Sequence, residues 1–235
     1  MDNSQTIEKL YGITTATIIA ALMKRGIRRA VMKGVMPMVP STQKCVGPAF
    51  TMRNIPIRED KGGAEKLGDP KYPQRVMLET APAGSIVVMD CMGEPGSAMA
   101  GDLMAARLKV RGIAGLVGDG GMRDVTETAT IGFPIYCKGP TPYPSTNAFL
   151  AHELQCPIAC GTVAVYPGDI IVADGDGVVV IPAHLAAEIA TESERQEKVE
   201  AFCKEKLLEG RPMPGTYPPS EATMREFEEW LKAGH

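Results

Sequence analysis

Two acidic residues and one arginine stand at the two ends of the apolar segment 103–122. Asp102 follows Gly101 at the first end, and Arg123 precedes Asp124 at the other. Carboxylates are hard oxygen ligands that suit a divalent cation such as magnesium, either directly or through its waters. An arginine offers a rigid fork of donors that matches a carboxylate. These residue types therefore predict a site for a metal ion and an organic acid.

The elements around these residues are expected to bring them to one edge of a sheet. The runs "GSIVVMD" and "GIAGLVG" are typical of buried strands, and "GDLMAARLKVRG" between them is long enough for a short helix. Strands joined in this way are parallel, so Asp102 and the Arg123-Asp124 pair should lie beyond their carboxyl ends. Open α/β sheets bind ligands at that rim.

The loop that enters the helix offers a second kind of ligand group. The backbone N–H groups of Gly101, Leu103 and Met104 would lie at a helix N-terminus, where an anion is favoured. Each charged residue also has an ordinary structural explanation: Asp102 as a helix cap, and Arg123 with Asp124 as a surface ion pair. Their convergence on one rim favours a functional site.

The rest of the chain predicts an α/β domain with helical extensions. "GITTATIIAALMKRG" predicts an N-terminal helix capped by Thr14 or Thr15, and "RDVTETATIG" predicts another short helix. The later runs, joined through "PGD" and "DGDG", are typical of antiparallel hairpins. A long charged helix begins near His184, and a Pro-rich connector and a short helix follow it. Further strands are expected in "KCVGPAFTMRN", "FPIYCKG", "PIACGTVAVYPGD" and "IIVADGDGVVVIP".

Composition excludes several classes of function. The chain has 235 residues, 44% of them hydrophobic, and a formal net charge of −3. Neither a nucleic acid nor an anionic membrane is expected as a partner, because no basic footprint is present. A polar start and the lack of a long apolar run favour a cytoplasmic protein.

Six cysteines in apolar stretches are expected to be reduced and buried, and three histidines give little basis for a zinc site.

Other motifs are assigned to structure. "GDGGMR" resembles part of a dinucleotide loop, but Arg123 stands where the third glycine should be, so no Rossmann cofactor is expected. "DGDG" has no acidic residue at the spacing that would close a calcium loop, and a hairpin turn explains it better. No lysine lies in a strand context that would suggest a Schiff base.

Residues Gly101 to Asp124 resemble the D-x20-R-D signature of the RraA-like family, which includes class II pyruvate aldolases. The resemblance extends from about Gly12 to Pro182, and "VYPGDIIVADGDGVVVIP" is a second recognisable piece. It implies a single domain over 1–235, with a core at about 12–182 and a C-terminal helical extension at about 183–235. The residues between the signature's ends that share the resemblance are Gly112, Gly115, Val117, Asp119 and Gly120.

The resemblance also implies a fold and an assembly. Family members are compact αββα sandwiches similar to the swivelling phosphohistidine domain, and form homotrimers or homohexamers with active sites between subunits. By matching positions, Asp124 would hold Mg²⁺ or Mn²⁺, and Arg123 and the amides of Gly101 to Met104 would bind the substrate. Asp102 would orient or deprotonate a metal-bound water. Glu197, from a neighbouring subunit, is the candidate for a further metal ligand, although a charged helix face explains it equally well.

The activity implied is cleavage of a 4-hydroxy-2-oxo di- or tricarboxylic acid to pyruvate and a second oxo acid. It would pass through a metal-stabilised enolate, with oxaloacetate decarboxylation as a side activity. The alternative is a non-catalytic protein-binding regulator of the ribonuclease E inhibitor type, which the same family contains. The preferred oxo acid stays open, because the segment 53–75 and the tail after Gly210 are longer than the family core and could reshape the pocket.

Overall fold

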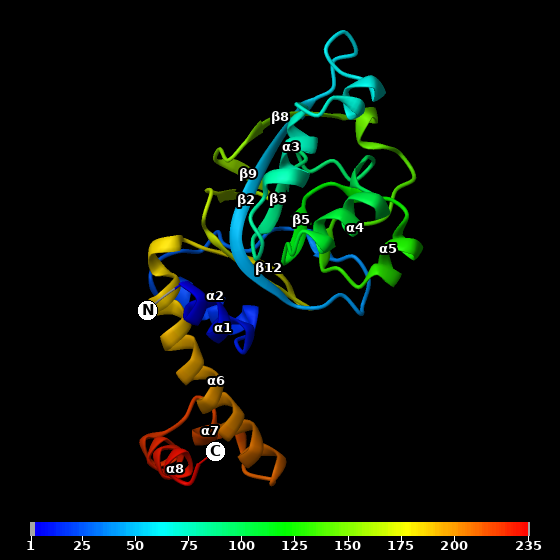
Figure 1. The fold of residues 1–235 in the computed structure, drawn as a ribbon. Helices are drawn as coiled ribbons and strands as arrows, with labels where there is room; N and C mark the ends of the chain where they lie inside the picture. The colour runs from blue at the N-terminus through cyan, green and yellow to red at the C-terminus, as the bar shows by residue number, and fades with distance from the viewer. Residues whose placement is uncertain (1–2, 235) are drawn as a thin grey trace.

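A strongly curved mixed sheet forms the centre of the computed structural model, which describes residues 3–234 (Figure 1). Its eight strands follow the order β1-β7-β5-β3-β2-β11-β12, and β8 pairs with the far end of β2. Contact between β1 and β12, the two ends of this order, shows that the sheet nearly closes on itself. The strands are β1 Met36–Pro37, β2 Cys45–Pro56, β3 Ile86–Asp90, β5 Gly115–Gly118, β7 Ile135–Cys137, β8 Phe149–Leu154, β11 Ile170–Asp174 and β12 Gly177–Ile181.

The middle of the sheet is parallel, as the alternation of strands and helices predicts. Strand β2 runs parallel to β3, β3 to β5 and β5 to β7, with Ile86 opposite Gly115 in the central pair. Both faces of β3 are buried, which explains its continuous hydrophobic sequence. Val87 and Met89 face one core, while Ile86 and Val88 face another.

Three helices cover the outer face of the parallel strands: α3 Pro73–Thr80, α4 Asp102–Val110 and α5 Val125–Ile131 (Figure 1). Met77 of α3 and Leu108 of α4 are fully buried in the core that these helices form with β3 and β5. The second core fills the inside of the curved sheet, under the hairpin of β9 Ile158–Cys160 and β10 Val163–Val165.

A third core joins the N-terminal helices to the antiparallel part of the sheet. Helices α1 Asn3–Tyr11 and α2 Thr15–Lys24 pack with the first half of α6 Ala186–Leu208 against β11 and β12. The cap that was predicted for α2 is present, since the Thr14 hydroxyl accepts a hydrogen bond from the Thr17 N–H at 3.2 Å. The β11-β12 hairpin is also confirmed, with Asp174 paired to Gly177 at its turn.

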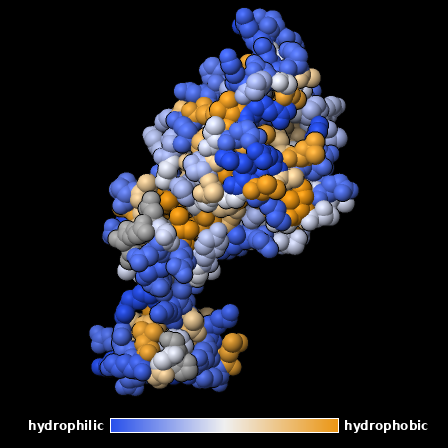
Figure 2. All heavy atoms as spheres, viewed as in Figure 1, coloured by the Kyte–Doolittle hydropathy of each residue, from blue (hydrophilic) through white to orange (hydrophobic). Residues whose placement is uncertain are grey.

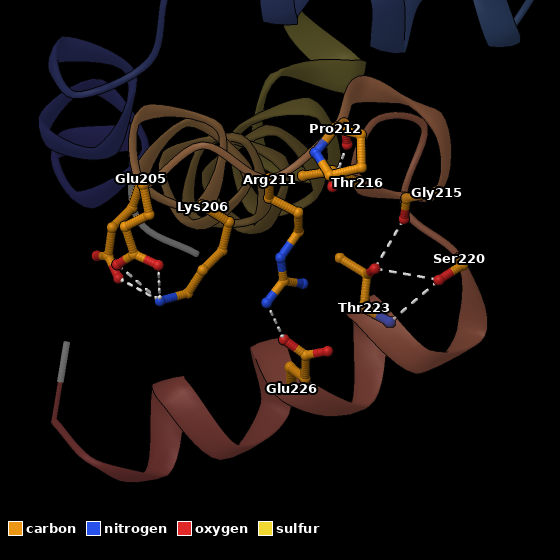
Figure 3. A network of polar contacts seen from close by, with 10 residues as sticks. Glu205, Lys206, Arg211, Pro212, Gly215, Thr216, Ser220, Thr223 and Glu226 are labelled. Carbon is orange, nitrogen blue, oxygen red and sulfur yellow. Dashed lines mark hydrogen bonds and ion pairs between the residues drawn. The ribbon is translucent and has the colours of Figure 1, made fainter.

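The second half of α6 leaves the body and carries a small C-terminal lobe (Figure 1). This lobe contains α7 Met213–Thr216 and α8 Glu221–Lys232, and Phe202, Phe227 and Trp230 pack as its aromatic core, with ring centroids 5.7–6.2 Å apart. Figure 2 shows hydrophilic residues over the neck between lobe and body. Figure 3 shows the polar contacts that close the lobe, among them the ion pair between Arg211 and Glu226 at 2.7 Å.

All six cysteines are free and buried, which confirms the expectation of reduced thiols. Burial raises the pKa of the Cys45 thiol to about 12 and raises those of Cys91 and Cys160 well above the ordinary value. These thiols stay protonated near neutral pH, so they are not nucleophiles.

The expected mixed α/β class is confirmed, while the finer comparison with a phosphohistidine domain stays a prediction. Within residues 3–234, no helix combines the length and the apolar character that crossing a bilayer requires. Several elements were not predicted from the sequence, namely α1, α3, β8 and the two short strands β4 Ala98–Ala100 and β6 Gly121–Met122.

Candidate functional site

The short parallel strands β4 and β6 position the charged residues of the candidate site. Ala98 pairs with Gly121 and Ala100 with Met122, and the Arg123 N–H donates to the Ala100 carbonyl at 3.2 Å. Because α4 begins directly after β4 and α5 directly after β6, both helix starts lie at the same edge. The rim is thus built by this second small sheet, and not by the ends of β3 and β5 alone.

Arg123 and Asp124 form an ion pair that lies over Gly101. The Arg123 Nε donates to the Asp124 Oδ2 at 3.0 Å, and the two side chains are 44% and 40% exposed. A Cβ on Gly101 would lie 2.7 Å from the Asp124 Oδ2 and 3.0 Å from the Arg123 Nε. Glycine at this position therefore makes room for both side chains.

Asp124 has an unusual backbone conformation, with φ 55° and ψ 36°. The left-handed region disfavours residues with a side chain, although aspartate tolerates it better than most. Asp124 stands at the N-cap of α5, yet its side chain makes no cap hydrogen bond. Its carboxylate instead turns toward Arg123, where it remains available to a ligand.

The start of α4 supplies a further carboxylate and a free amide. Asp102 Oδ1 accepts a hydrogen bond from the Leu103 N–H at 2.8 Å, so this carboxylate occupies one of the amides that the sequence offers to an anion. Among residues 3–234, the Met104 N–H has no hydrogen-bond partner. The start of α4 thus keeps a free backbone donor, of the kind that an anion binds at a helix N-terminus.

A cavity of about 140 Å³ lies beside Arg123 and the start of α4. It is lined by Gly101 to Met104 and Arg123, and also by Gln74 and Arg75 at the start of α3. A larger hollow of about 370 Å³ shares Arg75, Leu103 and Met104 with this cavity. No sequence pattern singles out Gln74 and Arg75, because they end a long segment without periodicity, and only Pro73 before them marks the start of a helix.

The structure does not bring Glu197 to this site within one chain. Its Oε1 accepts hydrogen bonds from the Thr14 N–H at 2.7 Å and the Thr14 hydroxyl at 2.8 Å. Figure 1 shows α6 at the opposite end of the body from α4 and α5. Burial acts to raise the pKa of Glu197, but the bonds from Thr14 hold that pKa below its ordinary value. A role for Glu197 in a neighbouring subunit's site stays a prediction.

The side chains present fit a divalent cation only in part. Among residues 3–234, no three His, Cys, Asp or Glu side chains are gathered as a metal site. Two carboxylates remain: Asp102 begins α4, and Asp124, the N-cap of α5, places its Oδ2 beside Gly101, the residue before Asp102. Magnesium is commonly held by one or two carboxylates, with waters and substrate oxygens as its other ligands, so this donor set suits Mg²⁺ better than a metal that needs a complete protein cage.

Comparisons with known proteins point to one family. The model of the family described as "RraA-like: Aldolase/RraA" matches residues 15–180, which is most of the body and none of the C-terminal lobe. A protein of Halalkalibacterium halodurans named "Putative 4-hydroxy-4-methyl-2-oxoglutarate aldolase" is 41% identical over 115 residues, which are 49% of this chain. The matched residues are 54% of that relative's own length, so the chain spans about half of it.

Two solved structures share the fold over most of the chain. An uncharacterized protein from Pseudomonas syringae pv. tomato superposes with a TM-score of 0.79 and 26% identity, covering 91% of this chain and 97% of its own. RraAS2 of Streptomyces coelicolor, described as an unusual member of the RNase ES inhibitor RraA protein family, has a TM-score of 0.76 and 32% identity. The coverage is 86% of this chain and 97% of RraAS2.

Proposed function

The chain belongs to the RraA-like family, and we propose that it is a divalent-metal-dependent lyase that cleaves a 4-hydroxy-2-oxo acid to pyruvate and a second oxo acid. One observation carries the proposal. The Arg123-Asp124 pair lies over Gly101, next to Asp102 and to a free amide at the start of α4, along a cavity sized for a small organic acid.

Arg123 and the start of α4 bind the 2-oxo acid end of the substrate. Only the Nε of Arg123 is engaged by Asp124, so its terminal nitrogens can donate to a carboxylate. The Met104 N–H adds a donor at a helix N-terminus, where negative charge is favoured. Because both groups are held by short strands and a helix, the substrate is oriented before the reaction begins.

Asp124 and Asp102 would hold Mg²⁺ or Mn²⁺, Asp102 through water. When bound, the cation supplies positive charge that stabilises an enolate. Asp102 is also the group that moves the proton, directly or through a water: it accepts the proton of the 4-hydroxyl as the C3–C4 bond breaks. The electron pair of that bond passes to the pyruvyl fragment, and returning the proton to C3 gives pyruvate.

Oxaloacetate decarboxylation follows from the same arrangement. Loss of CO₂ leaves the electron pair on C3, and the resulting enolate is the one formed in aldol cleavage. Protonation at C3 again gives pyruvate. The same residues therefore serve both reactions, and we expect decarboxylation as a side activity.

A binding function is the alternative, and the fold of RraAS2 supports keeping it, since that protein is described as a member of an inhibitor family. A regulator that acts by occupying its partner has no need of Asp102 and Arg123 at one cavity, with Asp124 paired to Arg123. Their arrangement here favours the enzyme. The same proposal includes an assembly, a homotrimer or homohexamer with sites between subunits. It also includes a cytoplasmic location and the phosphohistidine-type architecture.

Pyruvate release tests the proposal. The purified chain is assayed with oxaloacetate and with 4-hydroxy-4-methyl-2-oxoglutarate, in Mg²⁺ and then in chelator, beside Asp124→Ala and Arg123→Ala. Release that requires the metal and is lost in both variants is the expected result. A folded protein that releases no pyruvate from either acid would instead favour the binding function, and a lack of metal binding would remove the role given to Asp102 and Asp124.

A further inference from the structure

Three positively charged side chains without ion-pair partners line one hollow of about 510 Å³. The residues that line this cationic hollow are Arg28, Arg29, Val31, Lys33, Thr162 and Val163. Its three cations are exposed, and within residues 3–234 none of them makes an ion pair or a side-chain hydrogen bond. Lys24, earlier in the same basic stretch, is by contrast paired with Glu192 at 3.0 Å. The hollow thus presents positive charge that the protein itself does not neutralise.

The extended backbone of residues 29–33 places the cations on one face. The Ala30 carbonyl accepts a hydrogen bond from β12 at 2.8 Å, and the Met32 N–H donates one to β12 at 2.9 Å. Ala30 and Met32 are each 2% exposed, whereas residues 29, 31 and 33 are exposed. This is the alternation of a strand with one buried face, so Arg29 and Lys33 project from the same side.

The turn of the β9-β10 hairpin forms another wall of the cationic hollow. Gly161 and Thr162 of this turn have φ values of 53° and 69°, a region that a β-branched residue rarely adopts. The Lys33 N–H donates to the Gly161 carbonyl at 2.8 Å, and a Cβ on Gly161 would lie 2.8 Å from the Lys33 nitrogen. The turn therefore packs directly on the extended segment, and strained residues held in this way are common at ligand sites.

An adjoining hollow of about 310 Å³ supplies an aromatic side chain. It shares Arg29 and Val163 with the cationic hollow and is also lined by Tyr166, which is 57% exposed. Asp169 lines it too, but this carboxylate is 8% exposed and already accepts two backbone N–H groups, at 2.9 Å and 3.2 Å. Cations thus lie on one side of Arg29 and an accessible aromatic ring on the other.

We propose that the two hollows bind a nucleotide, with its phosphates at the three cations and its base against Tyr166. Arginine and lysine form strong charge-assisted hydrogen bonds with phosphate oxygens, and a base stacks on an aromatic ring. The chain carries a net charge of −3, and three cations are too few for the long basic surface that a nucleic acid requires. None of these residues lines the cavity beside Arg123, so the site does not depend on the proposed lyase.

Titration calorimetry with ATP in the presence of chelator tests this site on the full chain. The chelator removes metal ions through which a triphosphate could otherwise bind near Asp124. The wild type should bind ATP about tenfold or more tightly than adenosine, which has no phosphate. The double variant Arg29→Gln, Lys33→Gln should lose about tenfold or more in ATP affinity. Tyr166→Leu should lose about fivefold or more for ATP while its affinity for tripolyphosphate stays unchanged.

Two control variants separate the cationic hollow from other positive groups. Arg123→Gln removes the cation of the candidate active site, where an anion could also bind, and it should keep the wild-type affinity for ATP. Lys204→Gln removes an exposed cation of α6 that also lacks an ion pair among residues 3–234, and it should keep that affinity too. Thermal unfolding at the wild-type temperature shows that each variant remains folded.

The possible outcomes separate a nucleotide from other anions. No binding of ATP by the wild type, an unchanged affinity in the double variant, or an equal loss in Lys204→Gln overturns the site. Tripolyphosphate that binds as tightly as ATP overturns the nucleotide, because the base then contributes nothing. A single-stranded oligonucleotide that binds more tightly than ATP overturns the small ligand in favour of a nucleic acid.

Discussion

The Arg123 Nε donates to the Asp124 Oδ2 at 3.0 Å, and this pair lies where the side chain of residue 101 would be if that residue were not glycine. The two ends of the apolar segment 103–122 thus meet in space. Two of the predictions below concern this pair, a third concerns Glu197 and its contact with Thr14, and a fourth concerns the C-terminal lobe.

Gly101→Ala should impair the site while leaving the fold intact. The new Cβ would meet the Asp124 carboxylate and the middle of the Arg123 side chain, and both side chains are exposed enough to move away without disturbing the core. We expect a loss of about tenfold or more in kcat/KM for pyruvate release, because small displacements of positioning groups are costly. Thermal unfolding should be close to that of the wild type.

Gly68→Ala is the matched control for this substitution. Nothing lies within 4 Å of a Cβ at Gly68. Its kcat/KM should equal that of the wild type. A Gly101→Ala enzyme as active as Gly68→Ala would show that the position of the Arg123-Asp124 pair is unimportant.

Asp124→Asn and Arg123→Gln should have different effects. The first replaces a carboxylate ligand with a neutral amide, so Mn²⁺ binding should weaken by about tenfold or more. The second removes the fork that binds the substrate carboxylate, so KM should rise while Mn²⁺ affinity stays near the wild-type value. Titration with Mn²⁺ followed by steady-state kinetics checks both, and identical losses in the two variants would contradict the separate roles.

Glu197→Gln should destabilise the protein in a pH-dependent way. Burial raises the pKa of Glu197, but the Thr14 N–H and hydroxyl hold it below its ordinary value in the folded chain. A carboxyl with a lowered folded pKa stabilises the fold above its unfolded pKa of about 4.3, and that contribution is lost as pH falls through the folded pKa.

Urea unfolding at pH 7 and at a pH below the ordinary glutamate range measures this contribution. The gap in unfolding free energy between the wild type and Glu197→Gln should be present at pH 7 and narrow at the lower pH. Glu229→Gln, an exposed position on another helix, should show no gap at either pH. A gap that does not change with pH would mean that the bond from Thr14 does not require the charged carboxylate.

Phe202→Ala should unfold the C-terminal lobe and spare the candidate site. Phe202 is 1% exposed and packs against Phe227 and Trp230, and truncating a buried phenylalanine costs about 3–5 kcal/mol. Trp230 belongs to the lobe and is the single tryptophan of the chain, so its fluorescence reports the lobe alone. We expect a red-shifted emission with kcat/KM within about twofold of the wild type. Unchanged emission, or a loss of activity in step with it, would contradict a separate lobe.

The sequence by itself determined the elements whose signals are local. The apolar run of β3, the cap and apolar spacing of α2 and the turn residues of the β11-β12 hairpin each lie within a few neighbouring residues. Side-chain periodicity and turn chemistry act at that range. The helical segment between β3 and β5 predicts that the two strands are parallel, and they are.

Only the tertiary structure decided how the candidate site is built. Strands β4 and β6 are too short to show a period, and they exist because each pairs with the other. Glu197 meets Thr14, which is 183 positions away, and Gln74 and Arg75 meet Arg123 across a cavity that no local pattern encodes. Residue types and spacing indicated the chemistry of Asp102, Arg123 and Asp124. Packing between distant segments decided which other groups surround them, because such contacts depend on the whole chain closing around its cores.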